Sequence, residues 1–109
     1  MLQDAHTAKT SIGFTALAGA DRTIVAANPD AWIYVHEVMG DMSVTGTLAV
    51  KSGSTTLATF ALDAGQGLTA SDEPGNDNVA RFKCPPGQAF ILTPVTGNFI
   101  GTCDYSYRY

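Results

Sequence analysis

Charged side chains are scarce in this sequence. They make up 15% of its 109 residues, against about 25% in an average soluble domain. Interface cores are depleted of charge, so a chain with so little charge tends to cover part of its surface with a neighbour. We therefore expect the protein to work within an oligomer or a larger assembly.

Basic residues are the scarcer of the two charge types. The sequence has six Lys and Arg residues and ten Asp and Glu residues, which gives a formal net charge of -4. The six are scattered along the sequence, whereas nucleic-acid binders carry a basic stripe. An anionic membrane surface is disfavoured for the same reason. The composition predicts a protein that binds neither nucleic acid nor membrane.

Long apolar runs are also missing. No stretch approaches the roughly 18 apolar residues of a transmembrane helix. The first residues lack the basic start and the apolar run of a signal peptide. We expect the protein to be made and folded in a cytoplasm.

Cysteine and histidine occur only twice each. Cys84 and Cys103 fall in separate predicted strands, each on the more apolar face. We interpret them as buried free thiols, with a disulfide between neighbouring strands as the alternative. A Cys/His metal site would need further ligands at short spacing, and the sequence has none. No cofactor is expected.

The motifs of the common enzyme classes are absent or incomplete. Residues 65–70 match a loose dinucleotide fingerprint, but the following Pro74 and Gly75 leave no room for the helix that would receive the phosphates. His36-Glu37 lacks the second His of a zinc protease. No Gly-x-Ser-x-Gly elbow accompanies His36 as a base. We predict that the protein is not an enzyme.

Residues 43–62 predict a β-hairpin. Apolar and polar side chains alternate from 43 to 51, which places them on opposite faces of a strand. Gly53 permits the positive φ of a tight turn. From 55 to 62 the chain returns, again with apolar residues on one face.

The same alternation predicts further strands at residues 11–17, 22–27, 31–39, 78–84, 88–93 and 99–109. In the strand 31–39 both faces are apolar, with Ile33, Val35 and Met39 on one side and Trp32, Tyr34, His36 and Val38 on the other. Gly40-Asp41 is predicted to be a turn, and residues 68–77 a loop.

Evenly spaced short strands without a helical stretch are typical of an all-β fold. We predict a single β-sandwich or jelly-roll-like domain of about eight antiparallel strands over residues 11–109. Residues 1–10 have no strand or helix period and are predicted to be an extended N-terminal arm.

The loop 68–77 is acidic and could hold a cation. Its oxygen ligands, of the kind that Ca²⁺ takes, are Asp72, Glu73, Asn76 and Asp77. Their spacing does not match an EF-hand loop, and a solvated turn is the alternative. A weak calcium site is a hypothesis on these four residues.

Aromatic residues on the strand 31–39 and in the C-terminal strand admit two interpretations. They could form a sugar-stacking platform, or they could belong to the core or to a subunit interface. Because they alternate along strands instead of clustering in one loop, the second interpretation is favoured. Trp32, Tyr34 and His36 are the candidate interface residues.

The run from Val44 to Tyr107 resembles small virion structural proteins of tailed bacteriophages. The similarity lies in the segments Leu48–Leu57, Leu62–Leu68, Pro74-Gly75, Cys84–Leu92 and Gly101–Tyr107. It implies a β-sandwich protein of the capsid decoration or cement type, commonly a homotrimer, with no catalytic residue. It also implies the major capsid protein as partner and the capsid surface of the virion as location.

The sequence and this resemblance together predict an adhesive protein that stabilises a phage shell. Its arm, through Met1, Leu2, Gln3 and His6, is expected to contact the shell and to order on binding. Two alternatives remain open: a carbohydrate-binding β-sandwich for host or surface recognition, and a tail, neck or head-fibre component.

Overall fold

The computed structural model describes residues 9–65, 67–71 and 81–109, which form nine strands and no helix. The strands are β1 (Thr10–Ala16), β2 (Arg22–Val25), β3 (Trp32–Met42), β4 (Gly46–Ser52), β5 (Thr55–Leu62), β6 (Gly67–Ser71), β7 (Phe82–Cys84), β8 (Phe90–Pro94) and β9 (Phe99–Arg108). The all-β prediction is confirmed, with nine strands where about eight were expected.

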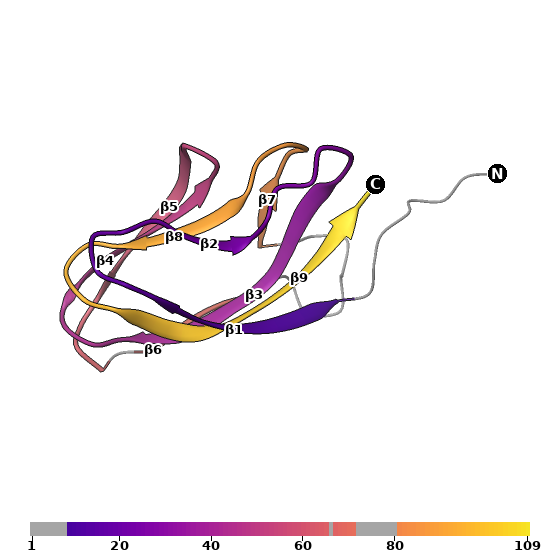
Figure 1. Cartoon of the computed structure of the whole chain (residues 1–109). Coiled ribbons are helices and arrows are strands. Elements are labelled where there is room, and N and C mark those ends of the chain that lie inside the picture. The colour runs from indigo at the N-terminus through magenta and orange to yellow at the C-terminus, as the bar shows by residue number, and fades with distance from the viewer. Residues whose placement is uncertain (1–8, 66, 72–80) are drawn as a thin grey trace.

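The strands form two antiparallel sheets that lie face to face (Figure 1). The first sheet has the order β1-β9-β3, and β6 and β7 follow one another along the other side of β3. The second sheet has the order β2-β8-β4-β5. This arrangement confirms the predicted β-sandwich.

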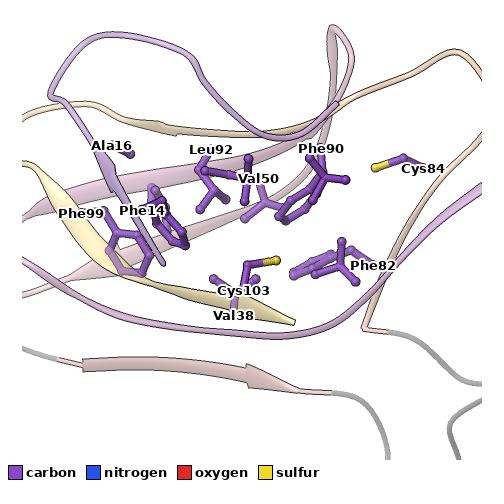
Figure 2. Close-up of a cluster of buried hydrophobic side chains, with 14 of the residues drawn as sticks. Phe14, Ala16, Val38, Val50, Phe82, Cys84, Phe90, Leu92, Phe99 and Cys103 are labelled. Atoms are coloured by element: carbon purple, nitrogen blue, oxygen red, sulfur yellow. The ribbon is translucent and has the colours of Figure 1, made fainter. Parts of the chain in front are cut away.

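Alternating side chains of both sheets fill the space between them. Phe14 and Phe99 meet on neighbouring strands of the first sheet with ring centroids 5.8 Å apart. Phe82 and Phe90 stack across the two sheets at 6.0 Å, and Figure 2 shows these rings with the aliphatic side chains around them. Aromatic pairs at this separation stabilise a core beyond the area that they bury.

The hairpin predicted over residues 43–62 is present as β4 and β5. Strand β5 has the predicted bounds, and Leu48 and Val50 of β4 are buried as expected. Gly53 lies in the turn with a φ of 57° and donates its N–H to the Ala89 carbonyl at 2.8 Å. The turn therefore needs glycine for its backbone conformation, and it is held by a neighbouring loop.

The prediction for the strand 31–39 was wrong about which residues share a face and about where the strand ends. The pairing of β3 with β9 shifts register between Val35 and Glu37, so His36 is the extra residue of a β-bulge. Beyond the bulge the two faces exchange: Val38 is buried with Val35, and Met39 is 42% exposed. The strand also continues through the predicted turn to Met42.

Part of the predicted loop 68–77 is a strand. Gly67–Ser71 form β6 and pair with the Glu37–Asp41 segment of β3. Later in the chain, the described part of the predicted strand 78–84 is β7, with Phe82 and Cys84 buried as expected.

Candidate functional site

The three candidate interface residues lie on β3 but differ in their surroundings. Trp32 is 43% exposed, Tyr34 is half-buried and His36 is buried. His36 lies with its Nε2 2.8 Å from the Ser106 hydroxyl oxygen on β9. Both side chains are buried, and the histidine serves packing here, since its ring is out of reach of solvent.

Tyr34 is engaged by cations of its own chain. Lys83 on β7 and Arg108 on β9 flank β3, with Lys83 Nζ 5.0 Å and Arg108 Cζ 5.2 Å from the Tyr34 ring centroid. Arg108 Nη1 also donates to the Tyr34 hydroxyl at 3.4 Å. Cation–π contacts of this kind stabilise the outer surface of the sheet. Tyr34 is therefore part of a structural cluster and not a free stacking surface.

The C-terminal tyrosines are structural as well. Tyr105 and Tyr107 pack edge to face at 5.7 Å and border the hydrophobic core. The Tyr107 hydroxyl donates to the Ala26 carbonyl at 3.1 Å, and burial raises the pKa of Tyr107, with Tyr105 and Tyr109 adding to the shift. Tyr109 accepts a hydrogen bond from Asn28 Nδ2 at 3.1 Å. These contacts tie the last strand to the loop after β2.

Both cysteines are buried free thiols, as expected. Burial raises the pKa of Cys103 to about 12, with smaller contributions from Asp104 and Cys84. Burial also raises the pKa of Cys84, against the opposing effect of a hydrogen bond with Ser52. A thiol reacts through its thiolate, so neither sulfur is disposed to exchange disulfides while the protein is folded.

The remaining candidates lie outside the described residues. These are the arm residues Met1, Leu2, Gln3 and His6, and the calcium candidates Asp72, Glu73, Asn76 and Asp77. Within the part of the chain that the structure describes, no three His, Cys, Asp or Glu side chains are grouped as a metal site would require. The same part contains no helix that could cross a membrane.

A shallow hollow of about 620 Å³ lies beside β1. The residues that line it are Gly13, Phe14, Thr15, Leu17, Arg22, Ile100 and Gly101. Its apolar walls include Leu17 and Ile100, each more than half exposed. Among these lining residues only Arg22 is charged, so the hollow offers apolar contact and no acid–base pair.

The free edges of the two sheets are the feature that sequence reasoning missed. Strands β1 and β5 each pair with a single neighbour among the described strands and contain no charged residue and no proline. Alternation along the sequence identifies strands, but an edge is defined only by the order of the strands in the sheet. The uncharged composition of Thr10–Ala16 and Thr55–Leu62 was the available signal.

Comparison with known proteins identifies a fold and no family. No protein-family model and no curated protein matches this sequence. Among solved structures, the fold matches a chain from a structure described with the words "Bacillus endospore appendages form a novel family of disulfide-linked pili". The TM-score is 0.52 at 17% sequence identity, over 98% of this chain and 89% of that chain. The two chains therefore share a β-sandwich fold.

The interpretation as a capsid decoration protein was wrong. The structural neighbour is a bacterial appendage protein, which is a structural protein of another kind. The resemblance rested on strand and turn segments, such as Cys84–Leu92 with Gly87 at a φ of 84°. Such segments are what many β-sandwiches need and do not identify one family. The two alternative functions gain no support, and the predicted partners and location have no counterpart in these findings.

Proposed function

We propose that this protein is a structural subunit that assembles with copies of itself into a fibre-like surface appendage. The observation that carries the proposal is the fold likeness to the endospore appendage chain, which covers 98% of this sequence. A shared fold suggests a function only by analogy. The chain's own surface must therefore supply the contacts that assembly needs.

Several surface features favour assembly. The chain has little charge, and large apolar side chains lie exposed on it at Leu17, Val95 and Ile100. Burial of apolar surface is the main favourable contribution to association. The two uncharged edge strands each pair on one side only among the described strands, so a neighbouring strand can bond to the other side. These features support self-association and require no other partner.

The cohesion between copies is noncovalent in this proposal. The appendages of the structural neighbour are disulfide-linked pili. In this chain Cys84 and Cys103 are the only cysteines, and both are buried with raised pKa values. A cross-link between copies would require the fold to open locally first, so that a buried thiol reaches the surface. Packing and backbone hydrogen bonds are left to hold the copies together.

The experiment is to follow the purified full chain by light scattering and negative-stain electron microscopy as its concentration is raised. We expect assemblies that grow with concentration and are equally abundant with and without a thiol reductant. A chain that stays monomeric at every concentration would refute the proposal. Assemblies that dissolve in reductant would instead refute its noncovalent part.

A further inference from the structure

Among the described strands, each sheet ends on one side in a long strand that contains no charged residue and no proline. Natural proteins protect sheet edges with charged residues, proline, short strands or bulges. Strand β1 has seven residues paired with β9 without a register shift, and it contains no charge. Strand β5 has eight residues, again without charge, proline or glycine.

The other edges are protected. Strand β2 is four residues long and includes Arg22. The far edge of the first sheet is divided between β6 and β7, and β7 carries Lys83. Among the strands that the structure describes, each sheet thus keeps one long edge without charge or proline. Strand β1 of the first sheet packs near β8 of the second sheet. In the second sheet β4 lies between β8 and β5, so β5 is on the side away from β1. The two edges therefore lie on opposite sides of the sandwich.

The β5 edge presents apolar side chains that its own chain covers incompletely. Its pairing with β4 shifts register at Leu57, which is 40% exposed. From Ala58 to Leu62 the pairing is regular. Ala58 and Phe60 pack against the core but stay partly exposed, because none of the described strands continues the sheet beyond them. A further strand would cover them and satisfy the outer backbone groups of β5.

The β1 edge offers a complementary surface. The shallow hollow beside it lies between Thr15, Leu17 and Ile100. A Cβ added at Gly13 would lie 3.8 Å from the Gly101 carbonyl oxygen, an ordinary van der Waals contact, so this part of the strand accepts a side chain without a clash. The apolar part of this surface matches in chemistry the exposed Leu57 side chain on β5.

We infer that β5 of one copy pairs with β1 of the next, an inference that rests on the proposed self-assembly. The two edges differ from each other, since one carries apolar side chains and the other a hollow. Contact between unlike surfaces on opposite sides of a molecule is head-to-tail, and it repeats into a filament when the rotation does not close a ring. Pairing of this kind covers both of the long open edges within the filament.

The test uses cysteine variants of the full chain on the two edges. Thr59→Cys on β5 and Thr15→Cys on β1 are purified separately, mixed under assembly conditions and treated with a short bismaleimide. Both positions are exposed, while the native thiols are buried. Thr23→Cys on the protected edge β2 is the matched control for each. We expect a cross-linked dimer from the Thr59→Cys and Thr15→Cys mixture, and at least about tenfold less from either variant alone or with the control.

Each other outcome refutes a defined part of the argument. A dimer formed by Thr59→Cys alone would show that β5 pairs with β5, which contradicts head-to-tail contact. Wild-type assemblies without a cross-link between the two edges would refute the edge pairing and leave the proposed function intact. A wild-type chain that never assembles would refute both.

Discussion

The buried imidazole of His36 makes a hydrogen bond with a hydroxyl group of the neighbouring strand. Its Nε2 lies 2.8 Å from the Ser106 hydroxyl oxygen, and both residues are buried. Removing one partner of a buried hydrogen bond costs about 1–3 kcal/mol, because the other partner stays desolvated. We predict that Ser106→Ala lowers the free energy of unfolding by this amount, measured by urea denaturation.

The exposed residue Thr102 on the same strand provides the control for this prediction. Thr102→Ala should change the free energy of unfolding by no more than about 0.5 kcal/mol, as is usual at the surface. If both variants lose the same amount, the hydrogen bond to His36 is not the source of the effect.

The buried thiols make the stability of the fold sensitive to alkaline pH. The pKa of Cys103 is raised from 9.0 to about 12, so its protonated form is favoured in the folded state. Below the unfolded pKa this contribution is fully present, because both states hold the proton. Between about pH 9 and 12 the unfolded chain releases the proton first, and the stability falls by up to about 1.4 kcal/mol per pH unit for each such group.

We therefore predict that the free energy of unfolding, measured by denaturant titration at several pH values, declines above about pH 9. Cys84 and Tyr107 also have raised pKa values and add to the decline. Cys103→Ala should be less stable at neutral pH but should show a shallower pH dependence. An equal slope in the variant would exclude Cys103 as a source of the pH dependence.

At the scale of elements, the contact between β3 and β9 requires glycine at Gly40. A Cβ at this position would lie 2.6 Å from the Ile100 carbonyl oxygen and 2.6 Å from Cζ of the Phe99 ring. Phe99 is fully buried and cannot move aside. Overpacking of this kind typically costs about 1–3 kcal/mol. We predict that Gly40→Ala lowers the melting temperature by several degrees, measured by circular dichroism.

Gly13 is the matched control for this contact, since it lies in β1 and a Cβ there would make only an ordinary contact, 3.8 Å from the Gly101 carbonyl oxygen. Gly13→Ala should leave the melting temperature nearly unchanged. Comparable losses in the two variants would point to backbone flexibility, and not to the close approach of the strands, as the cause.

Local sequence determines some of these elements and tertiary pairing determines others. The bounds of β5 could be predicted, because its alternation and the turn at Gly53 are local signals. The faces of β3 beyond His36 could not, because a bulge depends on the register with β9. Strand β6 was missed for a related reason: Gly67–Ser71 has little apolar alternation and is a strand through its pairing with β3.

The candidate site was less predictable than the fold. Trp32, Tyr34 and His36 were identified by residue type, but the packing of Tyr34 and His36 depends on Lys83, Ser106 and Arg108 from other strands. A sequence pattern shows which residues share a strand face and does not show which strands lie side by side. The open edges became visible only with the strand order.

At the scale of the whole molecule, the two sheets are open and have edge strands, unlike the sheet of a closed barrel. A closed barrel removes edges, whereas a sandwich must protect each one. This sandwich protects β2 and the β6–β7 side and leaves β1 and β5 without charge. In the proposed assembly these two edges make the contact, so a charge placed on one of them should act on assembly while leaving the fold intact.

Lysine on the β5 edge provides the final prediction. Thr59 is exposed on β5, and Thr23 is exposed on β2, the opposite edge of the same sheet. A lysine on an edge strand opposes pairing because its charge would have to be desolvated. We predict that Thr59→Lys weakens assembly at least about tenfold, which corresponds to about 1.4 kcal/mol, measured by light scattering at fixed concentration. Its melting temperature should stay within a few degrees of wild type.

Thr23→Lys adds the same charge to the same sheet and should assemble like the wild type. A loss of assembly in both variants would indicate a general effect of charge on a surface that has little of it. A loss in Thr59→Lys alone would place the contact at β5, since only that edge of the sheet is long enough and sufficiently free of charge to accept a neighbouring strand.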